Sequence, residues 1–390
     1  MMKAMILAAG RGTRVQPITN DIPKPMIQLL QKPVLESIIE HLRDNGITQI
    51  IINTSYLSTQ IEQYFGNGSR MGVQIAYSFE GEKIQDDLVP KALGSAGGMK
   101  KIQNETSFFD DTFLVLCADA LIDLDIKKVL QFHKKNNSIA TLALKQVASN
   151  DVHKYGIVEL NKENKIIQFQ EKPHPNLAVS NLANTGIYVF EPEIFNFIPS
   201  NIEYDIGSEL LPSIVQKELN IFGINIDYEW IDIGNVNDYY NATCRILKGE
   251  IKHYKILAKE VKKGIYLGLN VTVDLDKVTI IPPVFIGSST NIENGVTIIG
   301  PSMIGSNCQL KSNVVVIESI VDDYKTIMFP ANIEQKIVFS SSIIALDGNL
   351  VDTKQSELDW LIKDTRVKTT QTVLEKNIQL LLLKRDRDEF

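Results

Sequence analysis

The stretch from Ile286 to Ile320, IGSSTNIENGVTIIGPSMIGSNCQLKSNVVVIESI, decides the fold of the C-terminal part of the chain, because an aliphatic residue returns at every sixth position. A period of six matches neither an α-helix, with about 3.6 residues per turn, nor a strand, whose side chains alternate. It is typical of a parallel β-helix in which each hexapeptide forms one flat side of a coil. The aliphatic positions are Ile286, Ile292, Ile298, Ile304, Leu310 and Val316. A second set, mostly small or β-branched, follows four residues after each of them: Thr290, Val296, Ser302, Cys308, Val314 and Ile320.

The first 245 residues have a different sequence pattern, in which short β-branched runs alternate with helical spacings of apolar residues. The apolar spacing between Val34 and Leu42, followed by Asn45-Gly46, predicts an amphipathic helix with a C-cap. Such alternation predicts an α/β domain around a mostly parallel sheet, whose ligands bind at the carboxyl ends of the strands. The expected strands are 4–8, 49–53, 74–77, 112–116, 140–143, 156–160 and 186–190.

These sequence patterns predict an α/β domain over 1–248, a β-helix domain over 249–350 and a helical segment over 351–390. The C-terminal helix is expected to begin at Ser356. It could cap the end of the β-helix or contact a second subunit, and both alternatives stay open. Its expected apolar face consists of Leu358, Leu361, Val373, Leu374, Ile378, Leu381 and Leu382.

Composition excludes several classes of protein. A net charge of -7 argues against a nucleic-acid binder that relies on overall charge. The longest apolar run, at 380–383, is far shorter than the roughly 18 residues of a membrane-spanning helix. No signal-peptide pattern is visible, and the three cysteines lack metal-like spacing. We therefore expect no membrane or nucleic-acid partner, and a location in a bacterial cytoplasm or, if the chain is organelle-encoded, in a plastid stroma.

The segment LAAGRGTRVQPITNDIPKPM, residues 7–26, follows the first expected strand and has the composition of a phosphate-binding loop. Gly10 and Gly12 let backbone N–H groups approach an anion, while Arg14 and Lys24 add positive charge. A dinucleotide fingerprint would need a third glycine where this chain has Val15, and a Walker A loop would need Gly-Lys-Ser/Thr. The loop therefore belongs to another class of phosphate site.

Six motifs in chain order resemble those of the sugar-1-phosphate nucleotidylyltransferases. The C-terminal hexapeptide repeat is similar to that of the branch that includes bacterial mannose-1-phosphate guanylyltransferases and cyanobacterial and plastid members. The motifs are Leu7-Ala8-Ala9-Gly10-x-Gly12-Thr13-Arg14-x-x-Pro17-x-Thr19 with Pro23-Lys24-Pro25, then Leu93-Gly94-Ser95-Ala96-Gly97-Gly98, Tyr155-Gly156, Glu171-Lys172-Pro173, Asn184-Thr185-Gly186-Ile187-Tyr188 and Trp230-Ile231-Asp232-Ile233-Gly234. The resemblance implies a Rossmann-like nucleotidyltransferase domain followed by a left-handed β-helix.

The reaction that the resemblance implies is attack by a hexose-1-phosphate oxygen on the α-phosphorus of an NTP, with release of pyrophosphate. Two anions must meet, so the site needs positive charge and alignment more than acid–base groups. Arg14 and Lys24 are the implied catalytic residues. The implied nucleotide-binding residues are Leu7, Ala9, Gly10, Gly12, Thr13, Gly94 and Ser95, and the implied sugar-phosphate residues are Gly156, Glu171, Lys172 and Asn184.

Asp119 and Asp232 match the family's metal-binding aspartates and are the expected ligands of Mg²⁺. Either aspartate alone could equally be a helix cap at a strand end. The chain departs from the usual pattern in Ala118-Asp119-Ala120, and Asp205-Ile206-Gly207 replaces the usual Ser-Phe/Ile-Glu, which leaves part of the sugar specificity open.

We expect GDP-mannose synthesis from GTP and mannose-1-phosphate, with UDP-glucose synthesis from UTP and glucose-1-phosphate as the alternative. A non-catalytic regulatory subunit is a further alternative, although such subunits typically lose the charged loop or the aspartates. An acyltransferase β-helix would need a histidine, and residues 264–345 contain none. The β-helix or the C-terminal helix is expected to form a homo-oligomer.

Overall fold

The computed structural model describes residues 2–84, 87–251 and 254–367. The chain forms two compact units, one of residues 1–28 with 32–234 and the other of residues 29–31 with 235–390. The division falls before the predicted boundary at 248, because helix α7 (Val236–Leu247) packs with the second unit, where the Tyr240 hydroxyl donates to the Glu318 carbonyl at 2.8 Å. None of the helices in the described parts of the chain is long and apolar enough to cross a membrane.

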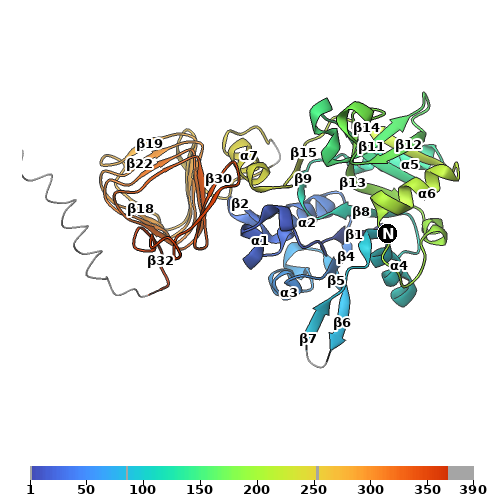
Figure 1. Cartoon of the computed structure of the whole chain (residues 1–390), viewed down its shortest axis with the longest axis horizontal. Helices are drawn as coiled ribbons and strands as arrows, with labels where there is room; N and C mark the ends of the chain where they lie inside the picture. Colours follow the sequence, from blue (N-terminus) through green and yellow to red (C-terminus); the bar gives the residue numbers. More distant parts are fainter. Residues whose placement is uncertain (1, 85–86, 252–253, 368–390) are drawn as a thin grey trace, which may run out of the picture. The chain divides into compact units, whose positions relative to one another are not determined.

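The first unit is built on a nine-stranded mixed sheet with the order β12-β11-β13-β8-β1-β4-β5, in which β10 joins β13 to β14 (Figure 1). The pairs β8–β1, β1–β4, β4–β5 and β10–β14 are parallel. The pairs β11–β12, β11–β13, β13–β8 and β10–β13 are antiparallel. The expected strands are present, but the sheet is mixed rather than mostly parallel. The strands are β1 (Lys3–Leu7), β4 (Gln49–Thr54), β5 (Gln74–Phe79), β8 (Phe113–Cys117), β10 (Ala140–Gln146), β11 (Gly156–Leu160), β12 (Ile166–Glu171), β13 (Leu182–Phe190) and β14 (Ile221–Asn225).

Helices and shorter strands complete this unit. The helix predicted after the first strand is α2, which buries its apolar face and ends at the C-cap Asn45. The helices are α1 (Ile18–Asp21), α2 (Val34–Asp44), α3 (Ser58–Phe65), α4 (Gly94–Thr106), α5 (Ile126–Lys135) and α6 (Leu211–Gln216). The short strands are the β6–β7 hairpin (Gly81–Ile84 and Asp87–Pro90) and the antiparallel pair β9 (Ala120–Ile122) and β15 (Trp230–Asp232).

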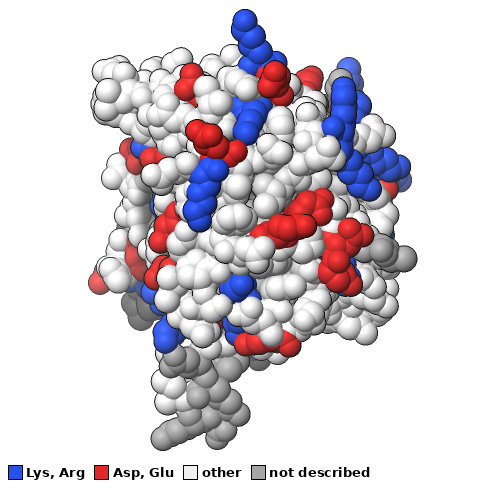
Figure 2. All heavy atoms as spheres, turned by 90° about the vertical axis from the view of Figure 1, so that its right-hand side faces the viewer, with Lys and Arg blue, Asp and Glu red and all other residues white. Residues whose placement is uncertain are grey.

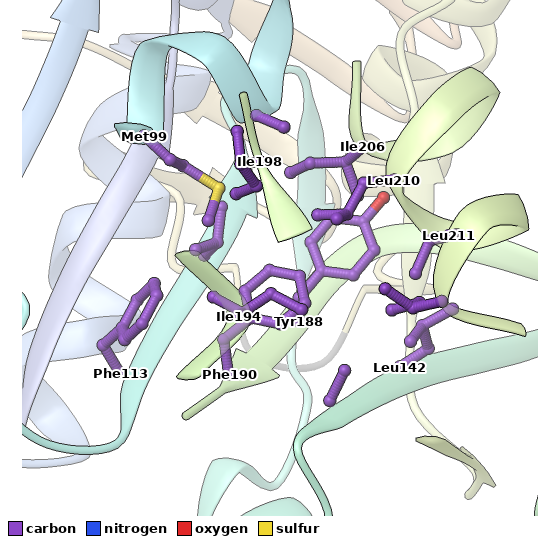
Figure 3. Close-up of a cluster of buried hydrophobic side chains, with 14 of the residues drawn as sticks. Met99, Phe113, Leu142, Tyr188, Phe190, Ile194, Ile198, Ile206, Leu210 and Leu211 are labelled. Atoms are coloured by element: carbon purple, nitrogen blue, oxygen red, sulfur yellow. The ribbon is translucent and has the colours of Figure 1, made fainter. Parts of the chain in front are cut away.

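A hydrophobic cluster joins α4 and α6 to one part of the sheet (Figure 3). Phe113 on β8 and Phe190 on β13 are fully buried, and Met99 of α4 packs into the same cluster. Tyr188 stacks on Phe190 with 5.4 Å between the ring centroids. Burying rings and branched aliphatic side chains stabilises the sheet by about 1.5–3 kcal/mol for each one, and it fixes the strand ends from which the polar residues described below project.

The second unit contains the predicted β-helix, with three sheets whose strands stack as the sides of successive coils (Figure 1). Ile286 pairs with Ile304, and Ile298 pairs with Val316, so three hexapeptides make one coil. After Val316 the repeat loses one residue, because Ile304 pairs with Val321 and Val316 pairs with Ile333. All twelve predicted positions are buried, which supports the six-residue period. The last position of the second set is one residue out of register, because Ile320 pairs with Met303 rather than with Ser302.

The strands of the three sheets are short and regular. One sheet contains β16 (Lys259–Lys262), β17 (Ile265–Leu267), β20 (Val284–Ile286), β23 (Ser302–Ile304), β26 (Ile320–Val321), β29 (Lys336–Phe339), β30 (Ser342–Ala345) and β31 (Leu350–Asp352). The second contains β18 (Thr272–Val273), β21 (Asn291–Ile292), β24 (Gln309–Leu310), β27 (Lys325–Ile327) and β32 (Ile362–Asp364). The third contains β19 (Thr279–Ile281), β22 (Thr297–Ile299), β25 (Val315–Ile317) and β28 (Asn332–Glu334).

The prediction of a helix beginning at Ser356 is wrong. Residues 356–361 form turns, and β32 then pairs antiparallel with β27. Of the predicted helix face, Leu361 packs against the β-helix core beside the buried Ile362, which was not part of that face, and Leu358 is half-buried in the turn. The other residues of the predicted face, from Val373 to Leu382, lie outside the described residues.

Candidate active site

A pocket of about 800 Å³ lies where the strands β1, β4 and β8 end, and Leu7, Asn53 and Cys117 line it from these strands. This is the carboxyl edge of the parallel part of the sheet, where α/β proteins bind their ligands. The pocket brings together most of the residues predicted from the motifs: Leu7, Ala9, Gly10, Arg14, Gly94, Ser95, Asp119, Gly156, Glu171, Lys172, Asn184 and Asp232. Gly12, Thr13 and Lys24 lie next to this lining rather than in it.

The loop after β1 closes tightly on itself. Gly12 has a φ of +65°, and a Cβ at this position would lie 2.9 Å from Lys24 Cβ, so only glycine fits without movement. Thr19 Oγ1 donates to the Gly12 carbonyl at 2.8 Å and fixes the turn. Thr13 and Arg14 are exposed, and Gly10 has open space where a Cβ would project. The loop therefore leaves room for an anion beside Gly10.

Lys24 and Asp119 form a close ion pair, with 2.6 Å between Nζ and Oδ2, and the lysine is 9% exposed. The short strands β9 and β15 bring Asp232 beside this pair, because Ile233 N donates to the Asp119 carbonyl at 3.0 Å. Asp119 and Asp232 both line the pocket. Their electrostatic fields add to burial in raising the pKa of the Cys117 thiol, and burial is the larger cause.

Asp119 directly precedes β9 and Asp232 ends the neighbouring strand β15. Two such carboxylates suit Mg²⁺, which binds proteins through one or two carboxylates and completes its shell with water and substrate phosphates. Within the described residues, no group of three or more His, Cys, Asp or Glu side chains forms a complete metal cage. The residues present therefore fit a metal that is held partly by the substrate.

The turn before α4 is held by the segment around Tyr204. Gly94 has a φ of +71°, and a Cβ there would lie 2.5 Å from the Tyr204 carbonyl oxygen. Ala96 N and Gly97 N both donate to that oxygen, at 3.0 and 2.8 Å. Ser95 Oγ donates to Asp205 Oδ2 at 2.7 Å and accepts from Ile206 N at 2.7 Å. The Ser95 hydroxyl therefore orders the pocket wall as well as lining it.

Asp205 is a pocket residue that the motif analysis recorded as a departure and assigned no role. Its Oδ1 accepts from Gly207 N at 2.8 Å and from Ser208 N at 3.0 Å. Burial would raise the pKa of Asp205, but the hydrogen bonds from Ser95, Ser208 and Gly207 outweigh burial and hold the pKa below its usual value. Asp205 is the N-cap of the segment Ile206–Leu210, because its side chain accepts from backbone N–H groups of the first turn.

The remaining predicted residues line the other wall of the pocket. Glu171 and Lys172 are exposed, with 3.3 Å between Lys172 Nζ and Glu171 Oε1. Lys172 has a positive φ of 46°, which is uncommon for a residue with a side chain. Asn184 Nδ2 donates to the Tyr188 hydroxyl at 2.8 Å. Burial raises the pKa of Tyr188, so this phenol stays neutral.

Several lining residues were not assigned to the site from the sequence, although two of them stand in recognised motifs. Tyr155 and Trp230 pack edge to face with 5.0 Å between their centroids, and both line the pocket. Asn53 and Glu80 line it from β4 and from the residue after β5. They stand outside the motifs, so no sequence signal identified them. On the face of the molecule shown in Figure 2, Lys and Arg side chains are interspersed with Asp and Glu.

Comparisons with known proteins agree with this geometry. Residues 3–249 match the family model described as nucleotidyl transferase. The chain belongs to this family. A UTP–glucose-1-phosphate uridylyltransferase from Synechocystis sp. is 50% identical over 365 residues, which cover 94% of each chain. The catalytic subunit beta of mannose-1-phosphate guanylyltransferase from Xenopus tropicalis is 32% identical over 63% of this chain and 65% of its own.

A solved structure of a UDP-glucose pyrophosphorylase in complex with UDP-glucose has the same fold as part of this chain. It covers 64% of this chain and 99% of its own, with a TM-score of 0.53 and 24% identity. The predicted resemblance to sugar-1-phosphate nucleotidylyltransferases is thereby confirmed for the family and the fold, and the chain is a nucleotidyltransferase enzyme of this kind.

Proposed function

We propose that this enzyme makes UDP-glucose and pyrophosphate from UTP and glucose-1-phosphate. The observation that carries the proposal is the 50% identity to the Synechocystis uridylyltransferase, because it extends over 94% of both chains and so includes the β-helix part. The Xenopus guanylyltransferase subunit is 32% identical over 63% of this chain. The proposal therefore replaces the expectation of GDP-mannose with its stated alternative.

The nucleotide is proposed to lie along the edge of the sheet between the loop after β1 and the turn before α4. Backbone N–H groups beside Gly10, together with the Thr13 hydroxyl, would bind the triphosphate. Arg14 is exposed at the pocket and would neutralise charge on the pyrophosphate as it leaves. The base would lie against the turn at Gly94, whose close approach to the Tyr204 backbone requires a residue without a Cβ.

The sugar phosphate is proposed to lie against Gly156, Glu171, Lys172 and Asn184. Glu171 would accept hydrogen bonds from sugar hydroxyls, and Lys172 would bind the phosphate. A phosphate oxygen of the sugar then attacks the α-phosphorus of UTP, the α–β phosphoanhydride bond breaks, and the electron pair leaves with pyrophosphate. This displacement needs alignment and positive charge, which the pocket residues supply without a general base.

Asp119 and Asp232 are the residues proposed to hold Mg²⁺, which would offset phosphate charge when bound. Lys24 forms an ion pair with Asp119 and would keep a fixed positive charge next to the reacting phosphates. Because one carboxylate oxygen already pairs with the lysine, Asp119 is held in one orientation before any ligand arrives.

The test is pyrophosphate release with Mg²⁺ over a grid of UTP, GTP, ATP and dTTP against glucose-1-phosphate and mannose-1-phosphate. We expect the highest kcat/KM with UTP and glucose-1-phosphate. A maximum with GTP and mannose-1-phosphate would instead establish the guanylyltransferase reading. Folded protein without turnover on any pair would favour the non-catalytic subunit.

A further inference from the structure

A buried chain of hydrogen bonds crosses the floor of the pocket. Ala8 N donates to Asn53 Oδ1 at 2.7 Å, Asn53 Nδ2 donates to Glu80 Oε1 at 2.6 Å, and Leu93 N donates to Glu80 Oε2 at 3.3 Å. Asn53 is 2% exposed and Glu80 is 3% exposed. A buried carboxylate is costly, so its two specific partners indicate a defined role.

The two ends of this chain are the two places proposed to bind the nucleotide. Ala8 begins the loop that includes Gly10, and Leu93 directly precedes Gly94 at the start of α4. Two side chains therefore join the triphosphate side of the pocket to the base side. The turn is also held by Tyr204, whose N donates to the Leu93 carbonyl at 2.9 Å, and the end of β1 is held by Ala118, whose N donates to the Leu7 carbonyl at 3.1 Å. Neither of these bonds joins the two segments to each other.

We propose that Asn53 and Glu80 are positioning residues that set the spacing between the phosphate loop and the base-binding turn, so that UTP meets both in their bound arrangement. The inference rests on the proposed function, because it takes the nucleotide to span these two segments. Pre-organised segments bind a ligand more tightly, since less ordering remains to be done on binding.

The donors and acceptors along the chain can be matched in few ways. Ala8 N–H and Leu93 N–H are fixed donors at the two ends, so each end needs an acceptor. Between them, one side chain must donate to the other. Asparagine at 53 with a carboxylate at 80 meets all three conditions, and so does aspartate at 53 with a carboxamide at 80.

Glu80 is held in place from several sides. Its N donates to the Thr54 carbonyl at 2.7 Å, and Ser55 Oγ donates to its carbonyl at 3.0 Å. A Cβ on Gly98 would lie 2.3 Å from Glu80 Oε1, so α4 approaches the carboxylate closely. Burial raises the pKa of Glu80, and the hydrogen bonds from Asn53 and Leu93 oppose that effect.

The experiment compares the wild type with Asn53→Asp, Glu80→Gln and the double variant. Asn53→Asp alone sets two carboxylates against each other, and Glu80→Gln alone sets an amide N–H against another donor. We expect each single change to raise the Kd and the KM for UTP roughly tenfold, because a buried polar group is left unmatched. The KM for glucose-1-phosphate is expected to change less than about twofold, and the double variant to return to within about threefold of the wild type.

Glu191→Gln is the matched control. Glu191 Oε1 lies 2.9 Å from Nε2 of the buried His133 and accepts from Thr112 Oγ1 at 2.7 Å, and it does not line the pocket. We expect this change to lower the Tm without altering the Kd for UTP.

Three results would overturn the inference: single variants with a wild-type Kd and a lowered Tm, a double variant that binds UTP no better than the singles, or an equal rise in the KM for the sugar phosphate. A wild type that binds GTP and not UTP would contradict the proposed function instead. The ratio of variant to wild-type Kd, measured with GTP, would then still decide the role of the pair.

Discussion

The two units of this protein depend on different kinds of contact: the β-helix repeats one contact from coil to coil, and the pocket uses contacts that each occur once. In the β-helix, Ile286 and Ile304 are fully buried in stacked ladders, and the same contact recurs from coil to coil. In the nucleotidyl transferase unit, the pocket depends on contacts that occur once, such as the one between Lys24 and Asp119 across 95 residues of sequence. A repeated contact spreads its energy over many equivalent positions, whereas a contact that occurs once concentrates a function in one pair.

This difference separates stability from activity. We expect changes in the pocket to reduce catalysis with small effects on folding, and changes in the β-helix core to reduce stability with small effects on catalysis. Variants of the two units therefore test the comparison directly.

The largest effect is expected for Asp119→Asn. The change removes a carboxylate proposed for Mg²⁺ and leaves the buried Lys24 without its 2.6 Å partner. We expect kcat to fall roughly 10²- to 10³-fold, as is typical when a group that offsets transition-state charge is lost. Steady-state pyrophosphate release as a function of Mg²⁺ concentration measures both the fall and the weakened metal dependence.

Asp125→Asn is the control for this change. Asp125 caps α5, where its Oδ1 accepts from Lys128 N at 3.1 Å, and it does not line the pocket. Asparagine is also a good N-cap, so kcat should stay within about twofold of the wild type. Equal losses in the two variants would mean that Asp119 acts through folding rather than at the reaction.

The next effect is expected for Gly94→Ala. The residue has a φ of +71°, and the new methyl group would lie 2.5 Å from the Tyr204 carbonyl oxygen, so the turn before α4 has to move. We expect the KM for UTP to rise roughly tenfold or more, because small displacements of a binding group are costly. Gly249→Ala supplies the same φ of +71° with open space around the Cβ. If both variants showed the same KM, the close approach at Gly94 would have no role in binding.

The sequence predicted the β-helix because its signal is local and periodic. The positions from Ile286 to Val316 are inward-facing at every turn of the repeat. The single-residue loss after Val316 is equally local, but it is visible only once the register is known. The helix expected from Ser356 was wrong because helical spacing of Leu358 and Leu361 is also satisfied by a turn that covers the end of a core.

The pocket was predictable only where a motif marks it. The Gly-rich loop and the aspartates Asp119 and Asp232 stand in recognisable motifs, and the structure brings them to one pocket. Asn53 and Glu80 carry no local signal, because their meaning comes from a hydrogen bond between two strand ends 27 residues apart. The antiparallel pairing of β11 and β13 likewise could not be predicted from the sequence, because the β propensity of a segment does not specify its partner strand.

In the β-helix, Ile298→Ala is expected to act on stability alone. Ile298 is fully buried and pairs with Ile280 and Val316 in neighbouring coils. Truncating a buried isoleucine costs about 2–5 kcal/mol of unfolding free energy, which thermal or urea unfolding will measure. The exposed Ile281→Ala, at 48% exposure, is the control and should cost far less. A fall in kcat below the transition temperature would break the separation between the units.

The smallest effect is expected for Leu361→Ala, at the end of the same core. Leu361 is only half-buried. Its N donates to the Leu358 carbonyl within the turn, and its carbonyl accepts from Met328 N, which brings Ile362 onto the last coil. Removing its side chain exposes less apolar surface than removing one inside a coil, so the loss should be about 1 kcal/mol. Unfolding measured beside Ile298→Ala will rank the two. If Leu361→Ala were the more costly change, the stability of the repeat would depend on its closed end rather than on its ladders, and the contrast between repeated and single contacts would then apply within the β-helix itself.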